Sequence, residues 1–397
     1  MTTMATRFRP ESTADLFSPE TIVDPFPVLD ELREQGPAVY MSKYDFWLLT
    51  RYDTVRAAAG DWQTYTSAQG VALTPQMNAN IADSVLATDP PDHDALRAVL
   101  SDKLAPRALG ETRAAIREYA DRLVSEVVES GRFDAVVDVA RVFPINVVAD
   151  LVGLPQEGRE RMHPGAQATF AGFGPFTPYV LEHMAEAQSY NEWMAMMTDR
   201  KSLAPGGWGE AVMDAVDDGR LTFVGAIKTI SAYMTAGMDT TVNAIAALLR
   251  LFAERPEVWD ALRANPAQIG PAFEEILRLE SPITGFFRVT THDVTLEEAE
   301  IREGSRVMLH WAAANWDPRH YDNPTSFDLQ RNPIDHLAFG YGVHGCAGQG
   351  LARMEIRSLL EAFLARVERF ELTGDVVRGL HPVVRSLDSV PLAVTLA

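Results

Sequence analysis

The chain has 397 residues, of which 47% are hydrophobic and 23% are charged, as in an ordinary soluble globular protein. Its 35 lysine and arginine residues are outnumbered by 55 aspartate and glutamate residues, so the net charge is −20. This excludes nucleic acid and anionic membranes as expected partners, because both attract concentrated positive charge. No segment is apolar over the ~20 residues that a membrane span needs, and the start lacks the apolar run of a signal peptide. A single cysteine provides no disulfide framework, so we expect a cytoplasmic protein.

The distribution of apolar residues predicts a mainly α fold with a minor β region. No repeat, low-complexity tract or Pro/Gly-rich linker divides the chain, so we predict a single domain over residues 1–397. A hairpin is expected over residues 38–50, and short strands are expected within residues 288–309. Helical spacing predicts helices over residues 109–129, 142–151, 179–197, 221–253, 256–265, 269–279 and 350–367.

The segment 221–253 is far longer than the ~11–12 residues of an average helix. Near its middle, Gly237 and the β-branched Thr240 weaken helix propensity on either side of Asp239. A threonine hydroxyl there can also bond back to the carbonyl four residues earlier and distort the helix. A distorted turn with an acid and an alcohol suits proton delivery. Taken alone, a solvated Asp239 beside packed threonines is an equal alternative.

The one cysteine, Cys346, lies in a glycine-rich loop directly before a predicted helix. Glycines let the backbone of such a loop approach a large flat ligand closely. The dipole and the free N–H groups of a helix N-terminus stabilise a thiolate. Without a second cysteine for a disulfide or a Cys/His set for zinc, this thiolate suits an axial bond to heme iron. In an ordinary context, a lone cysteine is instead a small buried hydrophobe.

The loop follows the pattern Phe-Gly-x-Gly-x-His-x-Cys-x-Gly from Phe339 and Gly340 to Gly348. Six such fixed positions coincide by chance in roughly one chain in a million. The pattern resembles the heme-binding loop of the cytochrome P-450 family, the heme-thiolate monooxygenases. The resemblance extends over about residues 24–396 and implies the family's fold, a triangular prism with a long central helix over the heme. It implies heme b as the cofactor, Cys346 as the iron ligand, and Ala236 facing the heme.

The same resemblance implies reductive activation of O2. Two electrons are expected to arrive singly from a ferredoxin that a ferredoxin reductase supplies from NAD(P)H. Asp239 and Thr240 match the acid–alcohol pair that the family carries in its central helix, so they are expected to relay protons. An acidic ferredoxin needs a local basic patch, although solvated helix charges are an equal interpretation of the residues concerned. The candidates for this patch are Lys103, Arg107, Arg353 and Arg357.

Two further sets of charged residues occur at family-like positions. Glu275 and Arg278 are three apart on one predicted helix face. Alone this spacing is common at surfaces, but in the family it marks a buried pair that bonds a later arginine, here Arg331, and fixes the cysteine loop. Heme propionates need cationic or donor groups. The candidates for that role are His93, Arg97, Arg288 and His344.

The predicted substrate pocket is aromatic with small gaps, which suits a compact planar molecule, although ordinary core aromatics are an equal alternative. Segments 170–175, 203–209 and 281–288 look like those of P-450s that oxidise para-substituted benzoates, often by O-demethylation. Those enzymes carry arginines where this chain has Gln69 and Ser231, so the charge that holds a carboxylate is lost. We therefore expect a small para-substituted aromatic acid, weakly held, or a neutral alkoxy or alkyl phenolic compound. The predicted pocket residues are Gln69, Phe170, Phe173, Phe176, Thr235, Ile283 and Phe286.

Three alternatives remain open at this point. The same chemistry could act on a terpenoid or a fatty acid. A peroxide-driven enzyme is disfavoured, because such relatives replace the acid–alcohol pair that is intact here at Asp239 and Thr240. A heme sensor without catalysis would bind gas without forming product.

Overall fold

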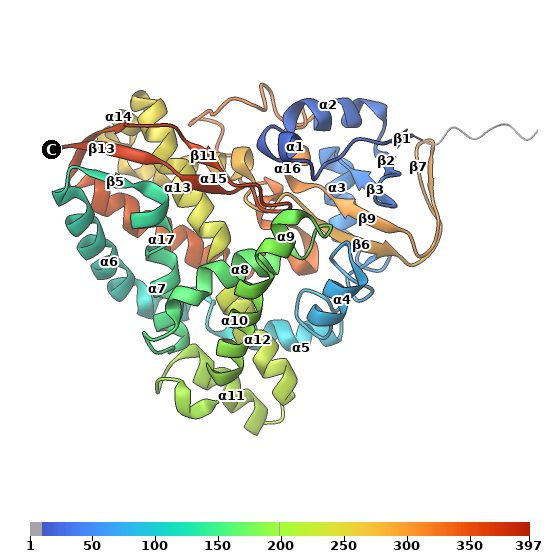
Figure 1. Ribbon diagram of the computed structural model, residues 1–397, viewed down its shortest axis with the longest axis horizontal. Helices are drawn as coiled ribbons and strands as arrows, with labels where there is room; N and C mark the ends of the chain where they lie inside the picture. The colour runs from blue at the N-terminus through green and yellow to red at the C-terminus, as the bar shows by residue number, and fades with distance from the viewer. Residues whose placement is uncertain (1–9, 198) are drawn as a thin grey trace, which may run out of the picture.

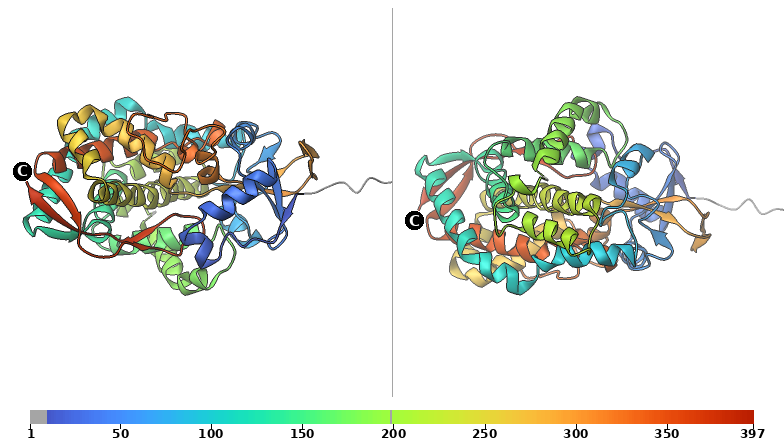
Figure 2. Two further views of the ribbon diagram at one scale, coloured as in Figure 1. Left: turned by 90° about the horizontal axis from the view of Figure 1, so that it is seen from above. Right: turned by 90° about the horizontal axis from the view of Figure 1, so that it is seen from below.

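The computed structural model describes residues 10–197 and 199–397 and confirms a mainly α protein with a minor β region. Its outline is triangular in Figure 1, and the perpendicular views of Figure 2 show a thinner body. Within the described ranges, no helix has both the length and the apolarity to cross a membrane. Residues 1–9, where we predict no signal peptide, lie outside the described residues. The single domain remains a prediction.

The larger β-sheet, on the right of Figure 1, has six strands in the order β1-β2-β3-β9-β6-β4. The predicted hairpin is confirmed, since β2 and β3 pair antiparallel with Tyr40 opposite Trp47. The predicted second β region is also confirmed, because β9 lies between β3 and β6. The six strands are β1 (Glu11–Ser12), β2 (Ala38–Met41), β3 (Phe46–Leu49), β4 (Tyr65–Thr66), β6 (Phe286–Thr290) and β9 (Arg306–Leu309). A separate two-stranded sheet pairs β7 (Val294–Leu296) with β8 (Ala299–Ile301).

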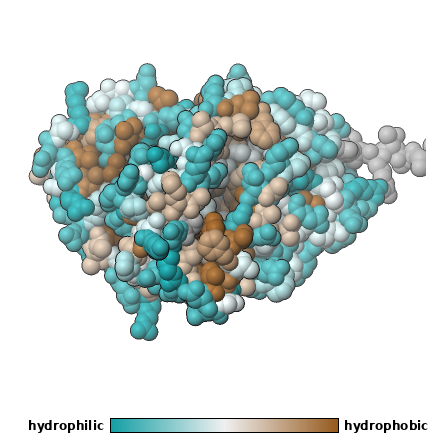
Figure 3. Space-filling view, turned by 60° about the horizontal axis from the view of Figure 1, so that its bottom comes forward, coloured by the Kyte–Doolittle hydropathy of each residue, from teal (hydrophilic) through white to brown (hydrophobic). Residues whose placement is uncertain are grey.

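Helices form the other side of the molecule and also cover the sheet. They are α1 (Pro19–Val23), α2 (Phe26–Gln35), α3 (Tyr52–Gly60), α4 (Pro75–Ile81), α5 (Asp92–Asp102), α6 (Pro106–Glu129), α7 (Phe143–Val152), α8 (Met162–Ala171), α9 (Pro178–Glu182), α10 (Met184–Met197), α11 (Trp208–Asp217), α12 (Phe223–Ala236), α13 (Asp239–Glu254), α14 (Pro256–Ala264), α15 (Ile269–Glu280), α16 (Trp311–Asn315) and α17 (Gln349–Leu364). On the face shown in Figure 3, hydrophilic residues dominate and apolar residues gather in small groups around a hollow near the centre.

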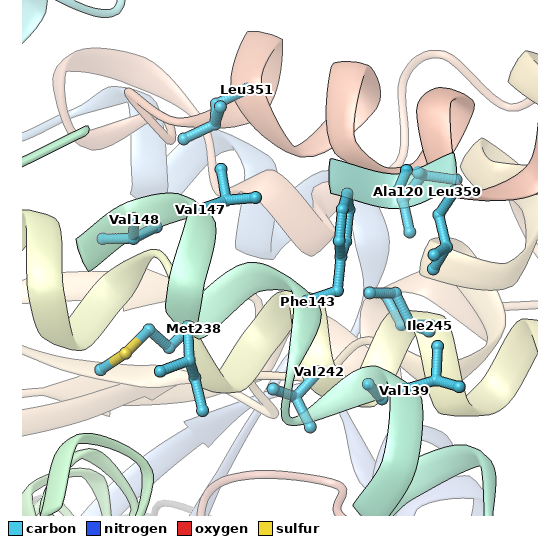
Figure 4. Packing of buried hydrophobic residues seen from close by; sticks show 14 of the residues in the cluster. Ala120, Val139, Phe143, Val147, Val148, Met238, Val242, Ile245, Leu351 and Leu359 are labelled. Carbon is cyan, nitrogen blue, oxygen red and sulfur yellow. The ribbon is translucent and has the colours of Figure 1, made fainter. Parts of the chain in front are cut away.

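The helical core surrounds α13. Figure 4 shows Val242 and Ile245 of α13 facing Phe143 of α7, with Leu359 of α17 and Ala120 of α6 beside them. All five side chains are buried. Burying a side chain such as that of Phe143 contributes about 1.5–3 kcal/mol, so this cluster fixes α13 firmly against its neighbours. The N-terminus of α13 is therefore held at a defined position in the molecule.

The long helix predicted over residues 221–253 is two helices, α12 and α13, separated by Gly237 and Met238. Met238 leaves the regular helical geometry, with φ −104° and ψ −71°. Thr240 Oγ1 donates to the Ala236 carbonyl at 3.2 Å across the interruption. The predicted distortion and its back-bonding threonine are thus confirmed, whereas the expected continuous helix is wrong.

Two other predicted helices have different limits. The helix expected over residues 179–197 is interrupted at His183, which separates α9 from α10. The helix expected up to residue 367 ends at Leu364 as α17, because Val367 already begins a strand. That strand belongs to a three-stranded sheet in the order β10-β13-β5, which the sequence analysis did not predict. The remaining strands are β5 (Arg132–Asp134), β10 (Val367–Leu372), β11 (Val377–Arg378), β12 (Leu387–Ser389) and β13 (Pro391–Leu396).

Candidate active site

The loop that carries Cys346 is closed by backbone contacts just before α17. The Cys346 N–H donates to the Phe339 carbonyl at 2.7 Å. Gly340 and Gly342 adopt left-handed φ values of 68° and 70°, which favour glycine. At Gly342 a Cβ atom would lie 2.5 Å from the Ala59 carbonyl oxygen, so a larger residue does not fit. These constraints hold the half-buried sulfur in place before the first turn of the helix.

Two effects act on the sulfur in opposite directions. Burial raises the pKa of the Cys346 thiol, whereas the N–H groups of Gly348 and Gln349 and the charge of Arg97 lower it. The helix N-terminus therefore favours the thiolate as predicted, but it does not outweigh burial. A metal cation bonded to such a sulfur deprotonates it outright.

Four predicted donors converge near the loop from separate segments. The rings of His93 and His344 lie 4.6 Å apart, centroid to centroid, in an edge-on arrangement. His344 Nε2 is 3.8 Å from Asp89 Oδ1. Arg97, one turn after His93 on α5, donates to the Gly345 carbonyl at 2.6 Å. Arg288 extends from β6, and its Nη1 donates to the Phe287 carbonyl at 2.7 Å. The structure therefore brings these four side chains to one region.

The donor set of this region fits the two carboxylates of a heme. The Nε2 atoms of His93 and His344 are buried without a hydrogen-bond partner. Burial lowers the pKa of Arg288 to about 10, so this buried guanidinium is still charged at neutral pH. Burial and the nearby Arg288 lower the pKa of His344 to about 4, so its ring is neutral there. Leaving a buried donor unpaired costs about 1–3 kcal/mol, so the set calls for an anionic acceptor.

The acid and the alcohol of the predicted relay open α13. Asp239 is completely buried, and its Oδ1 lies 3.3 Å from Asn243 Nδ2 and 3.5 Å from His163 Nε2. Its Oδ2 has no hydrogen-bond partner. Thr240 is the next residue and is partly exposed. The alternative of a solvated Asp239 is wrong, because the side chain is completely buried and its nearest ionisable neighbour is a histidine.

Two members of the predicted charge triad, Glu275 and Arg278, are completely buried, and the third, Arg331, is partly exposed. Glu275 accepts two hydrogen bonds from Arg278, from Nε and Nη2, both at 2.8 Å. Arg331 Nε donates to the same carboxylate at 3.2 Å. Arg278 also donates to the Asn315 carbonyl at 2.8 Å, and the Asn315 side chain accepts from Leu337 N–H at 2.7 Å. Leu337 opens the short helix that leads into the loop, so a chain of hydrogen bonds connects the triad to it.

A second carboxylate on the same helix, Glu274, was missed by the sequence analysis. It is 2.6 Å from Arg353 Nε and 3.1 Å from His336 Nε2. The guanidinium of Arg353 lies over the Phe339 ring, 4.8 Å from its centroid. In the sequence, only the two adjacent glutamates, Glu274 and Glu275, pointed to this contact. Its partners come from distant segments of the chain. Arg353, expected in a free basic patch, is thus paired with an acid, and Arg357 is 3.1 Å from Glu361.

Three of the predicted pocket aromatics form a continuous series. The ring centroids of Phe170 and Phe173 are 5.9 Å apart, and those of Phe173 and Phe286 are 5.4 Å apart. Ile283 pairs with Val384 through an isolated β-bridge beside this series. Phe176 does not join it, because its side chain is 52% exposed in the loop between α8 and α9.

The polar pocket candidates lie apart from that series. Thr235 Oγ1 is 3.4 Å from the Tyr190 hydroxyl, which directs it toward α10. Gln69 is exposed in the loop after β4. Ala236, the last residue of α12, is also exposed and accepts the Thr240 hydroxyl at its carbonyl.

Comparison with known proteins identifies the class to which this fold and site belong. The cytochrome P450 family model matches residues 209–378. Cytochrome p450 CYP199A2 of Rhodopseudomonas palustris is 36% identical over 392 residues, which cover 98% of this chain and 95% of that protein. The chain therefore belongs to the cytochrome P450 family. It is a cytochrome P450 monooxygenase, and its cofactor is heme b, bound in this family through a cysteine thiolate.

Other relatives agree with this assignment. Cytochrome P450 monooxygenase PikC of Streptomyces venezuelae is 31% identical and covers 93% of this chain, which in turn covers 91% of it. The solved structure of P450BioI, in complex with an acyl carrier protein carrying hexadec-9Z-enoic acid, has a TM-score of 0.85 at 27% identity. It covers 95% of this chain, and all of that chain is matched. These likenesses confirm the P450 fold.

Substituting Arg288 tests the predicted propionate site. We expect Arg288→Met to release heme to apomyoglobin about 10- to 100-fold faster, because a charge-assisted hydrogen bond contributes about 1.5–3 kcal/mol. Arg302→Met is the matched control, since Arg302 belongs to the same β region but is 71% exposed and paired with Asp293. Equal release rates for the two variants would remove Arg288 from the heme site.

Proposed function

We propose that this P450 monooxygenase hydroxylates or O-demethylates a small para-substituted aromatic compound. The substrate is a 4-methoxybenzoate-like acid or a neutral alkoxy or alkyl phenolic compound. The observation that carries the proposal is the aromatic series from Phe170 and Phe173 to Phe286. Aromatic walls favour a flat aromatic ligand, which can stack on a ring or meet it edge-on, over a bulky aliphatic one. The resemblance to P-450s that oxidise para-substituted benzoates supports the same substrate class.

The chain's own residues have separate tasks in this proposal. When bound, heme supplies the iron at which O2 is activated with two electrons from a ferredoxin. Cys346 would hold the iron through its sulfur, and Phe339 and Gly340 shape the loop that presents it. Asp239 and Thr240 would hold protons and pass them toward the bound oxygen. The two propionates would be held by His93, Arg97, Arg288 and His344.

A ferredoxin and its NAD(P)H-dependent reductase are the proposed electron source. Of the four basic candidates, Arg353 and Arg357 have acidic neighbours at short distance. Arg107 is exposed at the start of α6, and Lys103 follows α5. We therefore assign the recognition of an acidic ferredoxin first to Lys103 and Arg107. Their positive charges would attract an acidic partner that the net negative charge of the protein otherwise repels.

The substitution Gln69→Arg tests how the substrate is held. We expect it to raise the affinity for 4-methoxybenzoate about tenfold, because an arginine adds a charge-assisted hydrogen bond to the carboxylate. Affinity is measured by titrating the spin-state shift of the heme. Binding of neutral 4-methoxyphenol is the control and stays unchanged. If the affinity for the acid also stays unchanged, Gln69 does not face the substrate.

A ligand panel tests the proposed function as a whole. Methoxy- and alkyl-substituted benzoates, phenols and cinnamates are compared with terpenoids and long-chain fatty acids for spin-state shifts and for product formed with ferredoxin, reductase and NADH. We expect the para-substituted aromatic compounds to give both signals, with formaldehyde released from methoxy compounds. Shifts and product with fatty acids or terpenoids alone would overturn the aromatic assignment. If no compound shifts the spin state of the heme and none is converted to product, the result would favour a heme sensor.

A further inference from the structure

The only charged neighbour within 4 Å of the Asp239 carboxylate is His163 of α8, among the described residues. The two groups are 3.5 Å apart, between Nε2 of the imidazole and Oδ1 of the carboxylate. The side chain of Asp239 is 0% exposed, whereas that of His163 is 8% exposed. His163 Nε2 and Asp239 Oδ2 are both buried without a hydrogen-bond partner. The imidazole is thus slightly exposed where the acid is not, and both groups keep unused hydrogen-bonding capacity.

A second histidine near Asp239 is structurally committed. His381 Nε2 donates to the Gln167 carbonyl at 2.9 Å. Its Nδ1 accepts from the N–H groups of Val383 and Val384, at 3.2 and 3.0 Å. Burial lowers the pKa of His381, so the ring is neutral and its tautomer is fixed. Because both ring nitrogens are hydrogen-bonded to the backbone, His381 cannot pass a proton, and its role is structural.

The other titratable groups near Asp239 and His163 lead toward the surface. Tyr179 stacks on His183 with ring centroids 4.2 Å apart, and the His183 ring is partly exposed. Asp388, whose side chain is 48% exposed, has a pKa raised by burial and by the charge of Asp239. Arg141 is 3.8 Å from Asp388 and lowers that pKa. Glu186 of α10 adds a further negative charge near Tyr179. The charges of His163 and His183 also act on Asp388, so partly exposed polar groups lie in the neighbourhood of His163.

We propose that His163 is the positioning residue that connects Asp239 to solvent and recharges it with protons. In the step, an imidazolium form of His163 passes its Nε2 proton to Oδ1 of the Asp239 carboxylate, which leaves a neutral imidazole and a neutral carboxylic acid. Asp239 then gives a proton to Thr240, which returns Asp239 to the carboxylate. The neutral imidazole recovers a proton from a solvent hydronium ion, in the neighbourhood of His183 and Asp388. Only N–H and O–H bonds are exchanged, and no electron moves. This inference rests on the relay role of Asp239 in the proposed function.

The distance of 3.5 Å is compatible with this role. Hydrogen bonds of catalytic groups are often long in the ligand-free protein and tighten in the working complex. The break between α12 and α13 leaves Asp239 at a helix start, where its side chain can swing without disturbing a continuous helix. One oxygen of the carboxylate lies near His163 and the other has no partner. The carboxylate can therefore accept a proton from His163 at one oxygen and donate a proton from the other.

The experiment compares His163→Gln with Asp239→Asn and with the control His292→Gln, an exposed histidine far from the relay in sequence. The solvent deuterium isotope effect on NADH oxidation is measured with ferredoxin, reductase and 4-methoxybenzoate. We expect His163→Gln to slow NADH oxidation about tenfold and to raise the isotope effect at least about twofold. The tenfold loss of rate is smaller than the about 10²–10⁴-fold loss expected when a general acid at the reacting group is removed. His163→Lys, which keeps a protonated nitrogen, is expected to restore part of the rate.

An infrared measurement on the resting protein gives a readout that does not depend on turnover. The carboxylate stretching band of Asp239, in protein labelled with 13C-aspartate, is identified by its loss in Asp239→Asn. We expect this band to shift in His163→Gln and to stay in place in His292→Gln.

The outcomes separate two failures. If Asp239→Asn changes the isotope effect while His163→Gln does not, the inference about His163 is overturned and the relay remains. If neither variant changes it, the relay itself fails. A loss of thermal stability in His163→Gln with an unchanged isotope effect would show a structural role only and would also overturn the inference.

Discussion

Replacing Glu275 by glutamine is expected to lower the stability of the folded protein by about 3–5 kcal/mol. Glu275 and Arg278 are both 0% exposed, so the substitution leaves a buried guanidinium without its counter-charge. Arg331, at 14% exposure, loses the same partner. Because Arg278 also binds the Asn315 carbonyl, the damage extends along the hydrogen bonds that lead to the Cys346 loop.

The measurement for Glu275→Gln is urea denaturation followed by the heme absorbance and by circular dichroism. The matched control is Glu361→Gln, which removes surface ion pairs with Arg357 on α17 and with Arg117 on α6. Such a surface pair contributes only about 0–1 kcal/mol. We expect heme loss at a lower urea concentration in Glu275→Gln alone. Equal midpoints for the two variants would mean that the triad does not support the loop.

Replacing Asp239 by asparagine is expected to reduce turnover about 10²-fold, because a positioned proton donor contributes about 10²–10⁴-fold. The substitution conserves volume and keeps the hydrogen bond with Asn243 possible, so the start of α13 is preserved. The reduced protein with carbon monoxide should keep its wild-type spectrum. Electrons from NADH should then appear as hydrogen peroxide instead of product.

Thr240→Ala completes the test of the acid–alcohol pair. This variant also loses the bond from Oγ1 to the Ala236 carbonyl, so its thermal stability is measured alongside its coupling of NADH to product. We expect both variants to uncouple the reaction. Wild-type coupling in Asp239→Asn would contradict the proton-relay role.

Local pattern was enough to predict some elements and misleading for others. The β2–β3 hairpin follows from two short β-prone runs around a turn, where Asp45 has φ 56°. The sheet of β5, β10 and β13 could not be found this way, because β5 pairs Phe133 with Leu392 across most of the chain. In β10 the buried positions are Val367 and Phe370. Their spacing of three residues is the one expected on the buried face of a helix. The predicted α17 therefore extended too far.

The candidate site shows the same division. The motif around Cys346 and the spacing of Glu275 and Arg278 are local, so their neighbourhood was predictable from residue order. The contacts of Glu274 with His336 and of Asp239 with His163 join segments 62 or more residues apart. No local pattern connects such pairs, since only the packing of the helices brings them together.

The central claim is that the sulfur of Cys346 ligates the heme iron. The most direct measurement is the absorbance spectrum of the reduced, carbon monoxide-bound protein, compared between wild type and Cys346→His. We predict the thiolate-type spectrum for wild type and its replacement by a histidine-type spectrum in the variant, with heme retained. A histidine-type spectrum from intact, heme-loaded wild type, or a thiolate-type spectrum from Cys346→His, would contradict the account.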